Sequence, residues 1–119
     1  MARVKSIRAV LLSAPYAAPA GNAEVILHLP HGLRTTGLVE IALENGIKGL
    51  GEGYLAVFAP KVFVEIARLL APIVEGRDVR DLPAIVRNLK VAAGYWSYQG
   101  AAQHVVAAFE IALQDARAQ

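Results

Sequence analysis

The chain has 119 residues, the length of one ordinary domain with a single modest hydrophobic core. Hydrophobic residues make up 55% and charged residues only 18%, so the composition excludes an intrinsically disordered chain. Twelve Lys and Arg against ten Asp and Glu leave a net charge of +2, which argues against a dedicated nucleic-acid binder. The apolar excess has two interpretations: an Ala-rich domain whose apolar residues are internal, or, more strongly favoured, a domain whose surface is partly covered by another domain or subunit.

The sequence contains no cysteine, so it offers no disulfide framework, thiolate nucleophile or thiolate metal site. The basic residues near the N-terminus precede an apolar run over residues 10–12 that is too short for a signal peptide. Residues 91–109 carry no formal charge, but they contain too many polar side chains for a membrane span. We therefore expect a cytoplasmic protein that binds neither membranes nor nucleic acid.

The first part of the chain predicts strands and a long loop. Residues 4–12, rich in Val, Ile and Leu, predict a strand. Residues 13–33 show no helical period and are punctuated by proline and glycine, which predicts a loop, with a short extended segment over residues 25–29. A loop of this length in a compact domain is usually functional or mobile.

A β-hairpin is the clearest local signal. Residues 38–44 alternate between apolar and polar side chains, as in a strand with one buried face. Asn45-Gly46 then predicts a type I′ turn, in which both residues have positive φ, and the chain returns as the partner strand. Lys48 is placed to pair with Glu40 or Glu44 across the hairpin.

Three helices follow the hairpin. The first begins near Pro60 and is expected to end or kink at Pro72, and the second begins with Asp81 as its N-cap. Residues 94–100 predict a loop with three aromatic side chains, for which packing between helices is favoured over stacking on a sugar or base.

The last helix, over residues 101–118, is apolar nearly all round, so it needs burial on more than one side. We expect the rest of the domain to leave part of it uncovered. Three strands followed by three helices indicate the α+β class: a three-stranded antiparallel sheet followed by a three-helix bundle.

Residues with catalytic or metal-binding chemistry are sparse. His28 and His31 form a pair, but Pro30 between them and the scarcity of nearby ligands favour ordinary loop histidines over a metal site. His104 is expected to be a polar-face or interface residue rather than a general base.

The series Gly49-x-Gly51-Glu52-Gly53 lacks the spacing of a dinucleotide-binding fingerprint, and its acidic residue would repel phosphate. These glycines are interpreted structurally, as residues that let a strand bend. The chain has no Gly-x-Ser-x-Gly elbow either, so a serine hydrolase is not supported.

Four stretches, in this order and spacing, together resemble the N-terminal capping domain of the enolase superfamily, in the mandelate racemase and muconate lactonizing enzyme branch. The first is Ile7-Arg8-Ala9-Val10 with the following Pro15, and the second is the hairpin over residues 43–52, which resembles the pattern t-x-x-G-x-x-G-x-G-E. The third, residues 70–78, resembles l-x-P-x-l-x-G-x-D. The fourth, residues 107–115, resembles A-x-x-A-L-W-D, with Gln114 where Trp is commonest.

The resemblance implies that residues 1–119 are a single capping domain and that the catalytic (β/α) barrel is absent from this chain. In that superfamily the barrel supplies three acidic ligands for Mg²⁺ and the acid/base groups that abstract a proton α to a carboxylate. The chain itself would then hold no catalytic residue, no metal and no cofactor. Its implied partners are the cognate barrel domain or another copy of itself in a homo-oligomer, with a carboxylate substrate only in the full enzyme.

The resemblance also implies two loops that close over the substrate. The substrate-facing residues are Tyr16, Pro19 and Asn22 on the first loop and Gly53, Tyr54 and Leu55 after the hairpin, and the family motif residues are Gly49, Gly51 and Glu52. For Tyr16 and Tyr54, packing of the sheet against the helices is an equally weighted alternative.

The implied function is a lid that sets substrate specificity in an acid-sugar dehydratase, racemase or cycloisomerase and is not catalytic on its own. The alternative is a stand-alone α+β interaction or oligomerisation module without enzymatic activity. A remote third possibility is an independent small enzyme that uses His28, His31 or His104. The sequence leaves open whether the chain is an enzyme.

Overall fold

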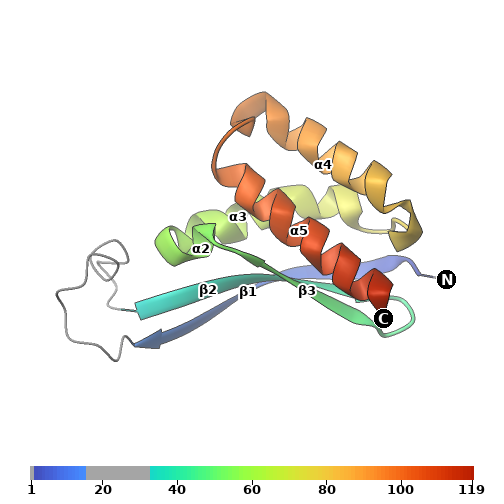
Figure 1. The fold of residues 1–119 in the computed structure, drawn as a ribbon, viewed down its shortest axis with the longest axis horizontal. Helices are drawn as coiled ribbons and strands as arrows, with labels where there is room; N and C mark the ends of the chain where they lie inside the picture. Colours follow the sequence, from blue (N-terminus) through green and yellow to red (C-terminus); the bar gives the residue numbers. More distant parts are fainter. Residues whose placement is uncertain (1, 16–32) are drawn as a thin grey trace.

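The computed structural model describes residues 2–15 and 33–119. In this part of the chain, three strands form one antiparallel sheet in the order β1-β2-β3, and the helices cover one of its faces (Figure 1). The elements are β1 (Val4–Pro15), β2 (Leu33–Leu43), β3 (Lys48–Gly53), α2 (Leu55–Phe58), α3 (Pro60–Val74), the 3-10 turn η1 (Val79–Asp81), α4 (Leu82–Ser97) and α5 (Ala101–Ala118). The predicted α+β class is confirmed, with the short helix α2 in addition to the three long helices.

The alternation along β2 decides which face of the sheet the helices cover. Val39 and Ile41 are fully buried, whereas the even-numbered residues of β2 are only half-buried on the opposite, open face. Successive side chains of a strand point to opposite faces, so one apolar row is enough to build the core. The largest fully buried side chains opposite this row come from all three long helices: Phe63 and Leu70, Ile85 and Leu89, Phe109 and Leu113.

The hairpin has the predicted position but not the predicted turn. No non-glycine residue described by the structure has a positive φ, and Gly46 has φ +90°, so the type I′ prediction is wrong. The Gly46 N–H donates to the Leu43 carbonyl (3.0 Å), and the Leu43 N–H donates to the Ile47 carbonyl (2.8 Å). This pattern belongs to a three-residue loop that ends in a left-handed glycine. The Asn45 side chain accepts from the Ile47 N–H (3.1 Å), so it closes the loop without a left-handed backbone of its own.

The predicted charge pair across the hairpin is present. Lys48 Nζ lies 3.6 Å from Glu40 Oε1, and Arg8 Nε lies 2.8 Å from the same carboxylate. The two cations lower the pKa of Glu40, chiefly through the hydrogen bond from Arg8. Glu40 therefore links all three strands on the open face of the sheet.

Two helices continue past the positions at which the sequence suggested an end, and the alternative of a kink at Pro72 stays a prediction. α3 continues past Pro72 to Val74, and the Glu75 N–H still donates to the Ala71 carbonyl (3.0 Å). α4 runs to Ser97 instead of ending before Gly94, so most of the predicted aromatic loop is helical. As a result Tyr95, which was expected to pack between helices, is 98% exposed.

The prediction that α5 would be left partly uncovered is also largely wrong. α5 lies between β3 and α4. Among its large apolar residues, Ile111 is exposed, with 49% of its surface accessible to solvent. The eight residues that it buries are Ala102, Val105, Val106, Ala108, Phe109, Ala112, Leu113 and Ala116. The exposed apolar side chains of the described residues gather instead on β1, α3 and the end of α4, among them Leu11, Leu12, Val62, Leu69, Val91, Tyr95 and Tyr98.

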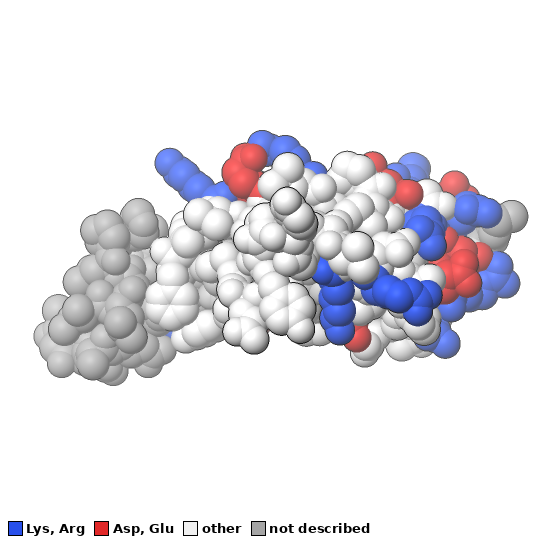
Figure 2. Space-filling model, turned by 90° about the horizontal axis from the view of Figure 1, so that it is seen from above, with Lys and Arg blue, Asp and Glu red and all other residues white. Residues whose placement is uncertain are grey.

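Charge is unevenly spread over the helix side of the molecule. In the view from above the helices, a broad part of the surface in the middle carries no charged side chain, and most Lys, Arg, Asp and Glu side chains gather toward the right-hand end, opposite the large grey group (Figure 2). This agrees with the uncharged run over residues 91–109, which spans the end of α4 and the first half of α5. No helix in residues 2–15 and 33–119 is long and apolar enough to cross a membrane.

Candidate functional site

The candidate site lies at the end of the sheet where β1 ends, β2 begins and β3 leads into α2, on the left of Figure 1. In the strand register, Pro15 lies opposite Leu33 and Gly37 lies opposite Gly53. This end of the sheet is therefore where the predicted first loop leaves and re-enters the sheet. Tyr16, Pro19 and Asn22 lie outside the described residues, as do residues 25–29, His28 and His31.

Tyr54 is a surface residue of this site, with 46% of its side chain exposed. It directly precedes α2, and its ring meets the Phe58 ring edge-on, with centroids 5.3 Å apart. The Arg34 guanidinium carbon lies 5.8 Å from the centroid of the Tyr54 ring, within the range of a cation–π contact. Arg34 is the second residue of β2. This contact therefore links the segment after the hairpin to the start of β2, where the predicted loop over residues 13–33 ends.

The other two residues predicted to face the substrate after the hairpin contribute to the core. Gly53 is buried, and a Cβ on it would lie 2.4 Å from Cε2 of Phe63. Leu55 is half-buried and packs against the hydrophobic core. Of this second group, Tyr54 is the residue whose side chain is presented to the surface.

The motif glycines have a packing role that the sequence interpretation missed. A Cβ on Gly49 would lie 2.1 Å from the Ala112 carbonyl oxygen, and a Cβ on Gly51 would lie 1.9 Å from the Ala108 carbonyl oxygen. Real Cβ atoms do not approach carbonyl oxygens so closely, so only glycine lets the backbone of β3 lie against the backbone of α5. The glycines therefore allow close helix–strand packing, and the interpretation that they let the strand bend stays a prediction. Glu52 of the same motif is exposed on the open face.

Sequence reasoning also missed Arg34, Phe58 and a hydroxyl pair near the same end of the sheet. Ser13 Oγ and Thr35 Oγ1 lie 2.9 Å apart, and Thr35 is buried among the described residues. A hydroxyl out of water needs such a partner. No local pattern predicts this pair, because it depends on the register between β1 and β2.

The site has an aromatic and cationic character but no catalytic cluster. Within residues 2–15 and 33–119, no three His, Asp or Glu side chains gather closely enough to hold a metal ion. His104 is exposed on α5 and borders an open groove with Tyr98 and Gln103. Its backbone carbonyl oxygen lies near Gly53, at 3.3 Å from the position of a Cβ on that glycine. The carboxylates with lowered pKa, Glu40 and Asp78, are held by arginines in ion pairs. The described residues can thus shape and contact a ligand at this end of the sheet.

These features define a class: an α+β domain in which a three-stranded sheet and its covering helices carry an aromatic cluster at the end of the sheet where β1 ends and β2 begins. Residues 29–119 match the N-terminal domain of the mandelate racemase / muconate lactonizing enzyme family, and the chain belongs to that family. The resemblance drawn from the four stretches of sequence is confirmed.

Solved structures give the same assignment. A protein from Sinorhizobium meliloti, assigned as an isomerase and seen in an open-loop conformation, is 33% identical with a TM-score of 0.78 over 98% of this chain and 32% of its own. L-Talarate dehydratase from Polaromonas sp. JS666, complexed with Mg and L-glucarate, is 25% identical with a TM-score of 0.77 over 99% of this chain and 32% of its own.

An enolase-superfamily member from Agrobacterium tumefaciens, 24% identical, has a TM-score of 0.80 over 98% of this chain and 34% of its own. This chain therefore spans about a third of the length of these relatives and corresponds to their capping domain. No curated protein sequence matches it significantly.

Proposed function

We propose that this chain is the substrate-specificity lid of an enolase-superfamily enzyme. In this proposal the end of the sheet near Tyr54 and the loop after β1 close over a substrate held by a (β/α) barrel domain. The observation that carries the proposal is the exposed cluster of Arg34, Tyr54 and Phe58 at the base of that loop, in a domain of this family. Tyr16, Pro19 and Asn22 would belong to the same lid.

The proposed substrate class is a polyhydroxy carboxylic acid. The talarate dehydratase relative binds L-glucarate, and the chemistry of the cluster suits such a ligand. A guanidinium pairs with carboxylates, a phenol hydroxyl exchanges hydrogen bonds with ligand hydroxyls, and aromatic rings exclude water from a closed site. Any Mg²⁺ would be held by the barrel, since the described residues offer no metal cluster. The lid residues would bind and orient the substrate.

The coding sequence that follows Gln119 in the genome provides a first, inexpensive test. A following frame that encodes alternating strands and helices with acidic residues at strand ends supports the lid. A stop codon supports the alternative of a stand-alone interaction module.

The direct test joins this chain to a barrel. The matching first third of the Sinorhizobium meliloti protein is replaced by this chain, which is 33% identical to it over 98% of the length. The parent and the chimera are assayed with Mg²⁺ against a panel of sugar acids. The proposal expects the chimera to be active with a changed order of preference among the substrates. A folded chimera whose preferences equal those of the parent overturns a role in specificity.

A matched pair of variants in the chimera then tests the cluster. Tyr54→Ala is expected to lower kcat/KM by about tenfold or more, equivalent to about 1.4 kcal/mol of transition-state binding. Tyr95→Ala on α4 makes the same change at a fully exposed tyrosine away from the site and is expected to leave kcat/KM unchanged. Equal effects of the two variants would remove Tyr54 from the lid.

A further inference from the structure

The two edges of the sheet differ in whether their outward backbone N–H and C=O groups have hydrogen-bond partners. Along β3, the Leu50 N–H donates to Asp115 Oδ2 (2.9 Å), and the Lys48 carbonyl accepts from Gln119 Nε2 (2.7 Å). Both partners come from the last turn of α5 and the residue after it, so this end of the chain occupies the outer edge of β3. An edge covered in this way cannot accept another strand there.

The direction of the free backbone groups on β1 follows from the hydrogen bonds of the hairpin. The N–H and C=O of Leu43 face β3, because they bond to Ile47 and Gly46. Backbone groups alternate along a strand, so the even-numbered residues of β2 turn theirs toward β1, where Glu40 lies opposite Arg8 and Leu38 lies opposite Val10. The odd-numbered residues of β1 consequently turn their N–H and C=O groups outward, at Ile7, Ala9, Leu11 and Ser13.

These outward groups have no bonded partner among the described residues. At the start of β1, the chain between α3 and η1 covers the edge: the Val4 N–H donates to the Arg77 carbonyl (2.9 Å), and the Gly76 N–H donates to the Val4 carbonyl (2.9 Å). From Ile7 to Ser13 no such bond follows. Pro15 is the next outward position of β1 after Ser13. This position suits proline, which has no N–H to donate. The edge open to pairing therefore extends over Ile7 to Ser13.

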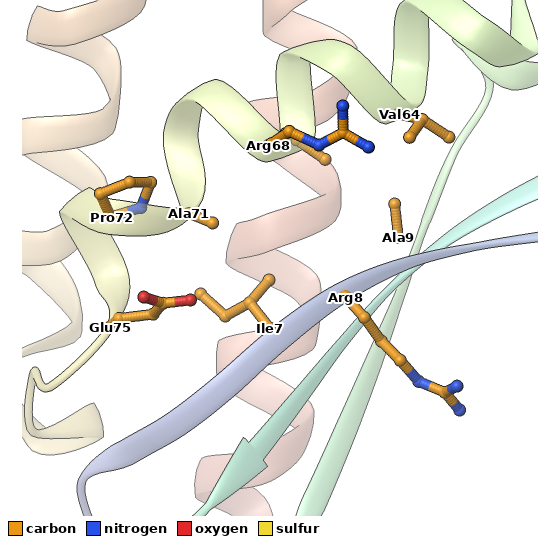
Figure 3. Close-up of a pocket in the computed structure, with 9 residues that line it drawn as sticks. Ile7, Arg8, Ala9, Val64, Arg68, Ala71, Pro72 and Glu75 are labelled. Carbon is orange, nitrogen blue, oxygen red and sulfur yellow. The ribbon is translucent and has the colours of Figure 1, made fainter.

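A groove of about 400 Å³ lies between this part of β1 and α3. In Figure 3, Ile7 and Ala9 point into it from the strand, whereas Arg8 points away from it. Its α3 side carries small or apolar side chains, Val64, Ala67 and Ala71, with Arg68 and Glu75 on the rim. A strand added beside β1 would present every second side chain to this groove.

We infer that a second copy of this chain pairs with this edge, β1 against β1 in antiparallel register, so that two three-stranded sheets become one of six strands. The strand itself supplies a fitting occupant, because its row of Ile7, Ala9 and Leu11 is apolar and would enter the partner's groove. A two-fold axis makes the contact self-complementary, as in most homodimers.

The side chains favour one register. With the axis at Ala9, the free N–H and C=O groups of Ile7, Ala9 and Leu11 are used, this apolar row pairs with itself across the axis, and Arg8 lies opposite the partner's Val10. With the axis one residue earlier, Arg8 would face its own copy, and like charges directly opposite each other are destabilising.

The first test measures the association of the 119-residue chain by sedimentation velocity over a wide concentration range. The chain is expected to form dimers. Leu11→Lys places a charge in the partner's groove and is expected to weaken dimerisation by about tenfold or more, while Leu12→Lys, on the open face of the same strand, leaves it unchanged. Both leucines are exposed, at 38% and 56%, so both variants are expected to fold. A monomer at all concentrations, or equal effects of the two lysines, overturns the inference.

The second test fixes the register, and the absence of native cysteine makes it clean. Ala9→Cys places two thiols across a hydrogen-bonded pair with Cα atoms about 5.5 Å apart, which is within disulfide range. Ser6→Cys places them six residues out of register, about 20 Å apart. The inference expects a rapid disulfide dimer for Ala9→Cys under mild oxidation and none for Ser6→Cys. Dimers that cross-link equally or not at all with either variant contradict the register with the axis at Ala9.

Discussion

The backbone of β3 at Gly51 lies so close to Ala108 of α5 that a Cβ on the glycine would be 1.9 Å from the Ala108 carbonyl oxygen. Gly49 makes the corresponding approach to Ala112 two residues earlier on the strand. The alanines recur four residues apart on α5, so one small-residue stripe of the helix meets alternate glycines of the strand. The hairpin motif of the family thereby fixes the position of its last helix.

The Gly51→Ala variant is expected to destabilise the domain by about 1–3 kcal/mol, at the upper end of this range, because the neighbouring atoms are backbone and cannot rotate away. Urea unfolding followed by circular dichroism measures the change. Gly94→Ala is the matched control, because a Cβ there meets nothing closer than Tyr98 Cδ2 at 3.9 Å inside α4. This control should stabilise the helix by up to about 1 kcal/mol. A tolerated Gly51→Ala would show that β3 and α5 separate easily.

Tyr54→Ala is expected to change the free energy of unfolding of the chain by less than about 1 kcal/mol, because the ring is half exposed and contacts one neighbouring ring. Phe63→Ala is the comparison, since Phe63 is fully buried under β2 and β3; it should cost about 3–5 kcal/mol. Thermal and urea unfolding of both variants check the contrast. A loss for Tyr54→Ala comparable to that of Phe63→Ala would make Tyr54 a core residue. For Tyr16 the same substitution tests the same prediction.

The stability of the domain is expected to fall as the pH is lowered below about 4. Asp78 accepts the Arg80 backbone N–H (2.9 Å) and lies beside the Arg80 guanidinium, and these contacts hold its pKa well below its usual range. The unfolded chain binds a proton near pH 4, whereas the folded chain binds it only at lower pH, so protons favour unfolding throughout that interval.

The measurement is the melting temperature at pH 7 and at pH 2–4 for the chain and for Asp78→Asn. The variant should be less stable at neutral pH and should lose less on acidification. Glu44→Gln, which removes an exposed carboxylate for which the structure shows no ion pair, serves as the control. An acid slope that Asp78→Asn leaves unchanged would mean that other carboxylates cause it.

The purified chain is expected to show no racemase, dehydratase or cycloisomerase activity by itself. These reactions need a metal-held carboxylate and a paired acid and base, and the described residues bring no such set together. The assay uses Mg²⁺ with sugar acids and mandelate-like hydroxy acids. Turnover that follows the protein through a second, different purification step would contradict the prediction and would direct attention to His28, His31 and His104.

Local sequence rules predicted the elements well where one strong signal acted alone. The alternation over residues 38–44 placed β2, and the Asn45-Gly46 pair placed the hairpin, although its turn type was wrong because the Asn45 side chain bonds Ile47 instead. The same rules ended α4 too early at Gly94, because one glycine lowers helix propensity by only about 1 kcal/mol and the helix continues around it. At the candidate site, sequence reasoning named Tyr54, while its contact with Arg34 depends on a distance across the sheet that no local pattern encodes.

Periodicity and motif spacing are properties of neighbouring residues, so they were enough to predict the class, the family and the order of the elements. Which apolar surfaces are covered depends on tertiary packing. The last helix looked too apolar for this chain to bury, yet β3 and α4 enclose it, because the glycines of β3 let its backbone come close. The edge of β1, which no periodicity singles out, is left open by the described residues, because α3 stands back from the strand at the groove and the outward groups from Ile7 to Ser13 meet no backbone partner among them. Burial and pairing depend on distances between segments far apart in the chain, so the fold assigns them.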